Sequence, residues 1–450
     1  MELKDKKVCV VGLGESGVWA CKLLAKMGAQ IKAFDQKPKS ELEQQMKELE
    51  KLNVSFKFAG YELKDFDKCE LVVLSPGVDE NQPLFKSLAQ KGIEIIGELE
   101  LAWRFTTAPI IAVSGTNGKT TTVSLLGEIF HQAYAEKAWV GGNIGTPLSR
   151  LVVEEKKPEV IILEVSSFQL AQSKSFKPKI GVMLNLAQDH LDRHQNMQAY
   201  FNAKLKLFAN QNKDEIAVLN ANDPWVRKME QHISSHILWF GDNLEDKAGA
   251  FFAGGQVIYR NSRREFSLSL KNWKLAGKHN LENLLASICC AGSWGVEKEQ
   301  VQKVIDSFSP LEHRLEFVRE FNGVKYYNDS KATNPHSVIN AVLSFDEPII
   351  LLLGGRNKDN DFSGLAELVK TKKVKVICFG EAGDDIKNQL EQKGVSAQRV
   401  DKMKEAFLLA NRLARPGWVV LLSPGCASFD EFKDYKERGK EFKKLVGELK

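Results

Sequence analysis

A short glycine-rich loop is the segment of the sequence best suited to chemistry. It follows the apolar run Ile110–Ser114 and precedes a helix-length amphipathic stretch. Glycines in such a loop turn backbone N–H groups towards phosphate oxygens, a lysine neutralises phosphate charge, and a threonine hydroxyl can ligate Mg²⁺. The loop consists of Gly115, Thr116, Asn117, Gly118, Lys119, Thr120 and Thr121. It predicts a short variant of the phosphate-binding P-loop, because Gly115 stands closer to Gly118 than the usual GxxxxGK[ST] pattern requires.

A second glycine turn stands near the N-terminus. Gly12, Gly14 and Gly17 follow an apolar run with the spacing GxGxxG, and Asp35 ends the next apolar run. Such a turn binds a pyrophosphate while an acid holds a ribose, which suits a dinucleotide and a nucleotide-sugar equally well. A bare strand-to-helix turn without a ligand stays open as the alternative. The segment from Ser75 to Gly77 ends another apolar run, and we expect it at the same edge of the sheet.

An acid, a histidine and a lysine follow the P-loop. Glu164 ends a buried apolar run, and His190 comes shortly after the run Ile180–Asn185. A carboxylate at a strand end beside a P-loop can hold Mg²⁺. A lone histidine is more often structural, but one that follows a strand end in this domain is a candidate catalytic group. Lys204 lies in an expected helix, Tyr200–Ala209, where the pattern alone favours an ordinary surface lysine.

The elements that position these residues alternate between strands and helices. The strands are continuous β-branched or leucine runs, which is typical of parallel strands covered on both faces. This alternation along the whole chain favours an α/β protein. We expect three domains: residues 1–98, 99–309 and 310–450. Three short runs between residues 238 and 275 indicate antiparallel strands of a small β insertion in the central domain: Trp239–Gly241, Gly254–Tyr259 and Phe266–Leu270.

The composition is that of a globular protein. The chain has 450 residues, of which 43% are hydrophobic and 27% charged, so it is neither disordered nor fibrous. A net charge of +5 over this length does not indicate nucleic acid or an anionic membrane as a partner. The seven cysteines include no CxxC pair, which favours small core residues in a reducing compartment. With no signal peptide and no membrane-length apolar run, we expect a cytoplasmic protein without membrane insertion.

Taken together, these motifs resemble the ATP-dependent Mur ligase family of peptidoglycan synthesis, with folylpolyglutamate synthetase as a relative. The loop Gly115–Thr121 resembles the family's phosphate loop, and the similarity covers essentially the whole chain. The other matching segments are Gly141–Gly145, Glu164–Leu170, Asp189–Arg193, Gly277–Asn280 with Asn283, and His313-Arg314. Asn328–Asn334 and Ser423–Ser428 with Asp430 resemble the branch that adds D-glutamate.

The resemblance implies a fold and an activity. The fold would be α/β with three domains: Rossmann-like at the N-terminus, a central P-loop ATPase-like domain with a parallel sheet and the small β insertion, and Rossmann-like at the C-terminus. The activity would be an amide ligation between UDP-N-acetylmuramoyl-L-alanine and D-glutamate, in which ATP converts the carboxylate to an acyl phosphate. The resemblance also implies a cytoplasmic enzyme of cell-wall synthesis that works as a monomer.

The resemblance further implies roles for individual residues. The catalytic residues would be Lys119, His190, Lys204, Arg314 and Lys331. ATP would be bound by the loop Gly115–Thr121 together with Asn280, Asn283, Arg314 and Asp329. The UDP-substrate would be bound by Gly14, Ser16, Gly17, Asp35, Ser75, Gly77, Asn143, Ser166, Gln169 and His190. D-Glutamate would be bound by Lys331, Thr333, Lys358, Ser428, Phe429 and Tyr435.

Two Mg²⁺ ions and a modified lysine complete what the resemblance implies. Thr120 and Glu164 would hold one ion, and His190 and Lys204 the other. Lys204 would carry a carbamate derived from CO₂, because an ammonium cannot ligate a metal whereas a carbamate can. One feature departs from the family pattern: Arg356 follows Gly354-Gly355 where the best-known members carry an acidic residue, although Lys358 falls at the expected lysine position.

Three alternatives remain at this stage. One is another amide ligase of the same superfamily, which amino-acid dependence of ATP turnover would reveal. Another is an NAD(P) dehydrogenase that uses the first glycine turn, a reading that leaves the P-loop and Glu164 unexplained. The third is an inactive nucleotide-sensing relative, against which the presence of Lys119, Glu164, His190 and Lys204 speaks.

Overall fold

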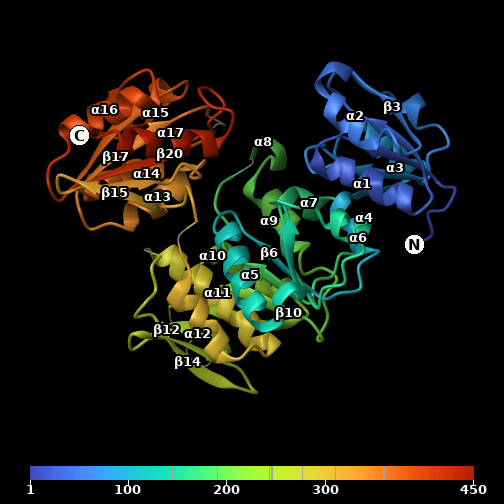
Figure 1. The fold of residues 1–450 in the computed structure, drawn as a ribbon, viewed down its shortest axis with the longest axis horizontal. Helices are drawn as coiled ribbons and strands as arrows, with labels where there is room; N and C mark the ends of the chain where they lie inside the picture. The colour runs from blue at the N-terminus through green and yellow to red at the C-terminus, as the bar shows by residue number, and fades with distance from the viewer. Residues whose placement is uncertain are drawn as a thin grey trace. The chain divides into compact units, whose positions relative to one another are not determined.

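Three sheets flanked by helices organise the part of the chain that the structure describes (Figure 1). The structure is a computed structural model, and it describes residues 1–143, 145–189, 191–242, 244, 247–275, 277–309, 311–357 and 360–449. By their contacts these residues form two compact units. The first unit contains residues 1–186, 193–270 and 283–304, and the second contains residues 187–192, 271–282 and 305–450. The α/β class is confirmed, whereas the domain boundaries at 98 and 309 stay predictions.

The first sheet is fully parallel, with the order β3-β2-β1-β4-β5. Its strands are β1 (Lys7–Val11), β2 (Gln30–Phe34), β3 (Val54–Lys57), β4 (Leu71–Leu74) and β5 (Glu94–Gly97). Its helices are α1 (Glu15–Lys26), α2 (Glu43–Leu49) and α3 (Pro83–Gln90). Parallel strands end at one edge, so the glycine turn after β1 and the segment Ser75–Gly77 after β4 follow neighbouring strands at the same edge, as expected.

The central sheet has the order β14-β13-β12-β11-β10-β9-β6-β8-β7. Its strands are β6 (Ile110–Ser114), β7 (Ala138–Gly142), β8 (Val160–Glu164), β9 (Ile180–Met183), β10 (Ile216–Asn220), β11 (His236–Gly241), β12 (Gly249–Ala253), β13 (Gln256–Arg260) and β14 (Glu265–Ser269). The helices in this part of the chain are α4 (Glu98–Trp103), α5 (Lys119–Tyr134), α6 (Leu148–Val153), α7 (Ser167–Ala171), α8 (Leu191–His194), α9 (Met197–Leu205), α10 (Pro224–Lys228), α11 (Lys278–Trp294) and α12 (Lys298–Ser307). The P-loop strand β6 lies between β8 and β9, in the interior of the sheet.

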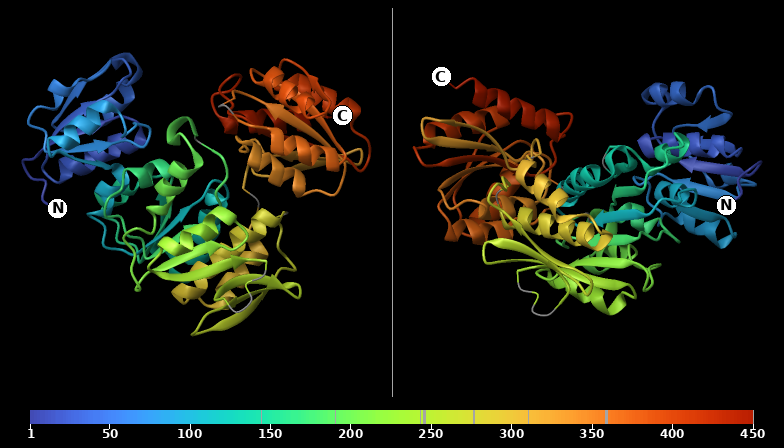
Figure 2. Two further views of the ribbon diagram at one scale, coloured as in Figure 1. Left: turned by 180° about the vertical axis from the view of Figure 1, so that it is seen from behind. Right: turned by 60° about the horizontal axis from the view of Figure 1, so that its bottom comes forward.

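The predicted β insertion is corrected in one respect. Its first run, Trp239–Gly241, belongs to β11, which pairs in parallel with β10 and with β12. In the described part of this sheet, the antiparallel pairs are β12 with β13 and β13 with β14, and these strands extend the edge of the same sheet (Figure 2). Trp239 and Phe240 are buried, which is the pattern of an interior strand and not of an exposed hairpin.

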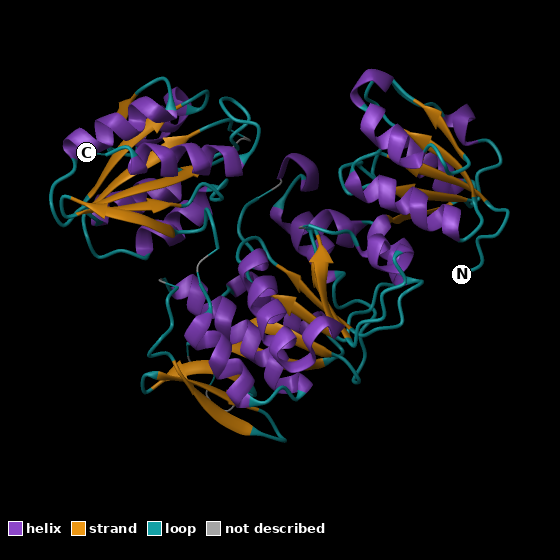
Figure 3. Cartoon of the chain, viewed as in Figure 1, coloured by secondary structure: helices purple, strands orange, loops and turns teal. Residues whose placement is uncertain are grey.

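The third sheet has the order β15-β16-β20-β17-β18-β19 and helices on both faces (Figure 3). Its strands are β15 (Glu316–Phe321), β16 (Val324–Asn328), β17 (Ile349–Gly354), β18 (Val374–Phe379), β19 (Ala397–Arg399) and β20 (Val419–Gly425). Its helices are α13 (Pro335–Leu343), α14 (Ser363–Thr371), α15 (Gly383–Gln392), α16 (Met403–Leu413) and α17 (Tyr435–Gly447). In β17, Leu351 packs into one apolar cluster and Leu352 into another, which explains why the strand is apolar at every position.

The burial of the cysteines agrees with the sequence analysis. All seven cysteines are buried and free of disulfides, as expected for core residues. Among the described residues, no helix combines the length and the apolar character that crossing a bilayer demands.

Candidate active site

The glycine loop adopts a conformation that requires its glycines. Gly118 has φ +85°, in the left-handed region, and α5 begins at the next residue, Lys119. A Cβ on Gly118 would lie 2.2 Å from Asn283 Oδ1, and a Cβ on Gly115 would lie 2.9 Å from Leu184 Cβ. At these two positions the backbone therefore passes too close to its neighbours for any larger residue.

Asn185, which follows β9, fixes the loop from the neighbouring strand. Thr116 N donates to Asn185 O at 2.9 Å, and Asn117 N donates to Asn185 Oδ1 at 2.8 Å. The Asn185 amide donates in return to Asn117 O at 3.2 Å. The sequence analysis did not single out Asn185, although an asparagine at the end of an apolar strand beside the P-loop strand is a signal that could have found it.

Lys119 folds back over the loop. Its Nζ donates to Gly115 O at 2.9 Å and to Thr116 O at 2.8 Å. The two loop carbonyls thereby fix the position of the ammonium, a cation of the kind that neutralises a phosphate.

A buried carboxylate lies beside the loop. Glu164 ends β8 with only 2% of its surface exposed, and Thr120 Oγ1 donates to its Oε2 at 2.8 Å. Asn143 Nδ2 donates to the other oxygen, Oε1, at 3.2 Å. A carboxylate and a hydroxyl are oxygen ligands of the kind that Mg²⁺ takes, so Glu164 and Thr120 fit a magnesium ion, while Asn143 orients the carboxylate through its amide nitrogen. Three predicted residues are thus brought together.

Lys204 is buried against the P-loop, which corrects the surface position favoured by its pattern. It is 1% exposed in α9, and its Nζ donates to Gly115 O at 2.9 Å and lies 3.3 Å from Ser114 Oγ. The ring of Tyr200 lies 4.9 Å from this Nζ, and the Tyr200 hydroxyl shares a 3.1 Å hydrogen bond with Thr116 Oγ1. The other predicted ligand of this site, His190, lies outside the described residues.

Ser166 and Gln169, both predicted to bind the UDP-substrate, are hydrogen-bonded to each other. Ser166 is the N-cap of α7, and its hydroxyl accepts from Gln169 N at 3.2 Å. Gln169 Oε1 accepts from Ser166 N at 2.9 Å, which completes a capping box. Their side chains therefore fix the turn that follows Glu164.

Asn283 accepts from Thr122 Oγ1 at 3.3 Å, which places it against α5, and Asn280 is buried in the first turn of α11.

The N-terminal glycine turn is closed by Asp35 and Ser75. Leu13 N donates to Asp35 Oδ2 at 2.7 Å, and Ser75 Oγ donates to Gly12 O at 2.7 Å. A Cβ on Gly17 would lie 1.9 Å from Gly12 O, so the helix and the turn meet backbone to backbone. A Cβ on Gly14, by contrast, would have nothing within 4 Å, so the N-terminus of α1 is open there. Ser16 lies in the first turn of α1, and Gly77 O accepts from Arg193 at 3.2 Å.

The second unit contains a half-buried acid, Asp329, near two arginines. Asp329 follows β16; its Oδ2 accepts from Ser423 Oγ at 2.8 Å and its Oδ1 accepts from Leu315 N at 3.1 Å. Burial raises the pKa of Asp329 to about 7, against the opposing charges of Arg314 and Arg438. The predicted ATP residues Arg314 and Asp329 therefore lie near each other in this unit.

Arg438, which the sequence analysis missed, forms hydrogen bonds to two loops near residues that were predicted to bind D-glutamate. It is completely buried, and its guanidinium donates to Ser330 O at 2.8 Å and to Cys426 O at 3.1 Å. It also donates to Ser330 Oγ at 3.0 Å, and burial lowers its pKa to about 10. One side chain thus connects the segment after β16 with the segment after β20. A lone arginine in a lysine-rich helix gave no signal of this role.

The residues predicted to bind D-glutamate differ in their exposure and contacts. Lys331 Nζ lies 3.9 Å from the centre of the Tyr435 ring. Ser428 is buried, Phe429 is 58% exposed, and Thr333 is half-buried. Lys358 and Asp359 lie outside the described residues. The backbone of Arg356 forms a β-bridge with Ala427. Its side chain forms an ion pair at 2.9 Å with Glu381, which lies in the loop after β18.

Family models match three successive parts of the chain. The Mur ligase MurD-like N-terminal domain matches residues 6–97, the Mur ligase middle domain matches residues 113–291, and the Mur ligase glutamate ligase domain matches residues 313–426.

Full-length relatives are also found. The UDP-N-acetylmuramoylalanine–D-glutamate ligase of Pelotomaculum thermopropionicum is 42% identical over 453 residues, which covers 100% of this chain and 99% of that relative. The same enzyme of Trichlorobacter lovleyi is 40% identical over 449 residues and is covered completely. Among solved structures, a pseudomurein peptide ligase type C from Methanothermus fervidus gives a TM-score of 0.61 at 15% identity, covering 99% of this chain and 100% of that one. MurC from Thermotoga maritima gives a TM-score of 0.59 at 18% identity, covering 99% of this chain and 100% of that one. These two structures support the fold alone.

Proposed function

The chain belongs to the Mur ligase family, and from that premise we propose that it joins D-glutamate to UDP-N-acetylmuramoyl-L-alanine at the expense of ATP. The curated relatives carry that activity in their names and share about 40% of residues over the full length. The observation that carries the proposal is the cluster in which Lys119, Lys204 and Thr120 meet around Gly115 and Glu164.

The cluster suits an ATP-dependent ligation. A carboxylate resists attack by an amine because oxide is a poor leaving group. Transfer of the ATP γ-phosphoryl group to a carboxylate oxygen releases ADP and forms an acyl phosphate. The neutral amine of D-glutamate then attacks the acyl carbon and loses a proton, and phosphate leaves. The triphosphate, the substrate carboxylate and the pyrophosphate are all anionic, so catalysis consists largely of positioning and charge neutralisation. Lys119, Arg314 and Lys331 are the cations we assign to that task.

Magnesium accompanies ATP in this family, and the residues at Glu164 fit it. Glu164 and Thr120 would hold one ion, which would shield the charge of the phosphates. For a second ion we assign His190 and a carbamate on Lys204. Carbamylation forms a bond between the neutral lysine nitrogen and the carbon of CO₂ and releases one proton. Burial disfavours the charged form of an amine, and the 1% exposure of Lys204 supports this assignment.

The two substrates are assigned to separate parts of the chain. We assign the UDP end to Gly14, Ser16, Gly17 and Asp35, because α1 presents an open N-terminus there and Asp35 is fixed by the turn. Ser75, Gly77, Asn143, Ser166, Gln169 and His190 complete that assignment. D-Glutamate is assigned to Lys331, Thr333, Lys358, Ser428, Phe429 and Tyr435. We also propose that the protein is a cytoplasmic monomer.

The test is phosphate release with UDP-N-acetylmuramoyl-L-alanine against a panel of D- and L-amino acids. We expect release to require both this substrate and D-glutamate, with Lys119→Ala as the inactive control. Equal turnover with L-glutamate or diaminopimelate would indicate another Mur ligase, and turnover with a folate would indicate a folylpolyglutamate synthetase. Either result contradicts the proposal.

A further inference from the structure

A buried histidine that the proposed reaction does not use connects α7 with α9. His194 is the last residue of α8, and only 8% of its surface is exposed. Its Nε2 shares a 2.9 Å hydrogen bond with Ser167 Oγ, in the first turn of α7. Ser167 is buried as well, so this bond is shielded from water. A buried side chain with a satisfied hydrogen bond is held in one orientation, which makes the imidazole a rigid part of the structure.

The His194 ring contacts two aromatic side chains. It stacks on Phe168 of α7, with the ring centres 5.3 Å apart and the ring planes 17° from parallel. It also contacts Tyr200 of α9, with the ring centres 5.2 Å apart and the planes inclined by 41°. Ring pairs at these separations attract each other beyond the area that they bury. The imidazole therefore joins two helices that pack side by side (Figure 1).

Tyr200 in turn contacts the P-loop. Its hydroxyl shares a 3.1 Å hydrogen bond with Thr116 Oγ1, and the centre of its ring lies 4.9 Å from Lys204 Nζ. Tyr200 and Lys204 stand four positions apart in α9 and so occupy one face of the helix. Lys204 Nζ reaches the same loop, because it donates to Gly115 O at 2.9 Å. A displaced Tyr200 ring would therefore disturb the loop and the surroundings of Lys204 together.

The backbone of His194 helps to fix the start of α9. The next residue, Gln195, has φ +65°, a left-handed conformation that residues other than glycine seldom adopt. Asn196 then caps the helix: its N donates to His194 O at 2.7 Å, and its Oδ1 accepts from Ala199 N at 2.9 Å. The side chain and the backbone of His194 thus both determine where α9 lies, and with it the two side chains that reach the P-loop.

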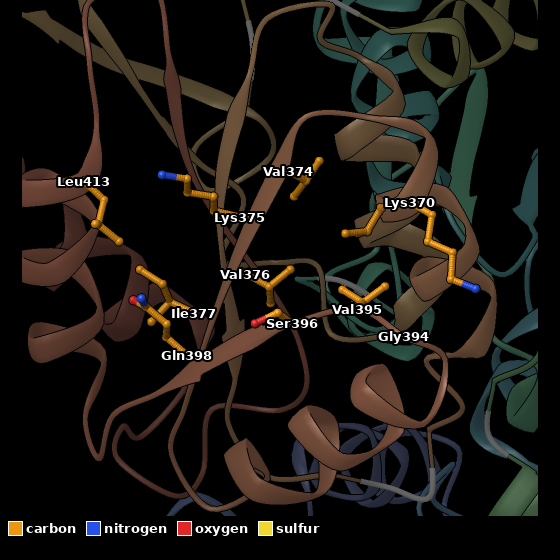
Figure 4. Close-up of a pocket in the computed structure, with 11 residues that line it drawn as sticks. Lys370, Val374, Lys375, Val376, Ile377, Gly394, Val395, Ser396, Gln398 and Leu413 are labelled. Carbon is orange, nitrogen blue, oxygen red and sulfur yellow. The ribbon is translucent and has the colours of Figure 1, made fainter.

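A cavity of about 390 Å³ at the start of β18 supports no comparable inference (Figure 4). Its apolar lining consists of Val374, Val376, Val395 and Leu413. Lys370, one of its cations, is already paired with Glu367 at 3.0 Å. Nothing in the part of the chain that the structure describes indicates what covers this apolar surface.

We propose that His194 is a positioning residue for the bound nucleotide and for Lys204, and that it acts through Tyr200. This role rests on the proposed function, because the P-loop is taken as the ATP site. The imidazole, held by α7, fixes the Tyr200 ring, and the Tyr200 hydroxyl fixes Thr116 in the loop that would surround the phosphates. Positioning matters in phosphoryl transfer, where a displacement of about 1 Å costs about a hundredfold in rate.

The first test removes the hydrogen bond that orients the imidazole. His194→Phe keeps an aromatic ring but lacks Nε2, and Ser167→Ala removes the same bond from the other side. We expect each change to weaken binding of a non-hydrolysable ATP analogue with Mg²⁺ by about fivefold to tenfold, measured by calorimetry on the full-length protein. We also expect kcat for phosphate release to fall by about tenfold. KM for D-glutamate should stay unchanged, because the residues assigned to it belong to the second unit.

A double-variant cycle distinguishes positioning through Tyr200 from a general stabilisation of α9. Tyr200→Phe removes the bond to Thr116 and should weaken nucleotide binding by a similar factor. If His194 acts through Tyr200, the double variant His194→Phe/Tyr200→Phe should bind the nucleotide no more weakly than Tyr200→Phe alone. His232→Phe is the matched control, because His232 is exposed and its ring meets that of Phe201, the neighbour of Tyr200 in α9, at 6.3 Å. It should bind the nucleotide as the unmodified protein does.

The outcomes separate this role from the proposed function. Unchanged affinity and kcat in a folded His194→Phe variant would overturn the role, and so would additive losses in the double variant or an equal loss in His232→Phe. Ser167→Ala, the smaller change, decides the question if His194→Phe does not fold. A protein that binds the nucleotide but ligates an amino acid other than D-glutamate would contradict the proposed function and leave the positioning role intact. A protein that binds no nucleotide would contradict both.

Discussion

Thr120 Oγ1 donates a 2.8 Å hydrogen bond to Glu164 Oε2, and this contact joins the P-loop to the strand beside it. The register of the central sheet produces it, because Val113 of β6 stands opposite Glu164 of β8. The acid is thus held beside Thr120 of the loop by the pairing of two buried parallel strands.

Replacement of Glu164 by Gln should remove the magnesium-dependent activity and leave the fold intact. The amide keeps the shape and can still accept from Thr120, but it lacks the negative charge that a divalent cation requires. We expect ATP turnover to fall by at least about a hundredfold, measured as phosphate release over a range of Mg²⁺ concentrations. Glu159→Gln, an exposed residue at the other end of β8, serves as the control. Unchanged magnesium dependence in Glu164→Gln would contradict the assignment.

Lys204→Ala should be inactive and should regain part of its activity when a short-chain carboxylate is added. The carboxylate would take the place of the proposed carbamate in the space left by the buried side chain. Phosphate release with and without added formate or acetate measures the rescue, and ¹³C NMR of the unmodified protein under ¹³CO₂ looks for the carbamate directly. Lys206→Ala, two residues further along the chain, is the matched control. Full activity of Lys204→Ala without a carboxylate would exclude the modified lysine.

The sequence predicted the parts of the fold that depend on local pattern. The continuous apolar run Ile110–Ser114 located β6 with the bounds that the structure gives it, because strands covered on both faces need apolar residues at every position. The glycine spacing predicted the turns whose close backbone approaches are now seen at Gly17 and Gly118.

Features that depend on distant neighbours could not be predicted in this way. The sequence pattern around Lys204 favours a surface position. Its burial depends on contacts with Tyr200 and with the carbonyl of Gly115, which the local pattern does not reveal. Arg438 stands in a helix of mostly charged residues, and only the loops after β16 and β20 give its guanidinium partners. The direction of β11 was misjudged because a short apolar run does not reveal whether its neighbours are parallel.

Gly118→Ala should distort the P-loop more than the same change at Gly145. Both glycines have a left-handed backbone, with φ +85° and +76°, so both variants carry strain of about 1–2 kcal/mol. Only at Gly118 would the added Cβ collide, 2.2 Å from Asn283 Oδ1, whereas Gly145 has open space around it. Nucleotide binding measured by calorimetry should therefore be lost in Gly118→Ala and retained in Gly145→Ala. Equal affinities in the two variants would contradict the close packing.

Arg438→Lys should loosen the loops that carry Ser330 and Cys426. Lysine keeps the charge, but one ammonium cannot reach the several acceptors that the planar guanidinium serves. Buried carbonyls would lose their donors, at a cost of about 1–3 kcal/mol each. Hydrogen exchange should accelerate in the segments after β16 and β20. Arg412→Lys, at an exposed site on α16, should leave exchange unchanged, and the same result for Arg438→Lys would show that the contacts carry little energy.

The stability that Asp329 contributes should decrease as pH rises from about 4 to about 7. Burial raises its pKa from 3.8 to about 7 in the folded chain, so the folded state holds the proton more tightly than the unfolded state does. The contribution is complete below pH 3.8, is lost progressively through the folded pKa and is constant above it, with a slope of at most about 1.4 kcal/mol per pH unit. Asp329→Asn removes the titrating group, so the difference in unfolding free energy between protein and variant should change across this window.

Asp361→Asn is the control, because hydrogen bonds from Ser363 lower the pKa of Asp361, and its effect should appear only below pH 3.8. Urea unfolding of ligand-free protein at several pH values measures both, and a difference that stays flat between pH 4 and 7 for Asp329→Asn would contradict the raised pKa.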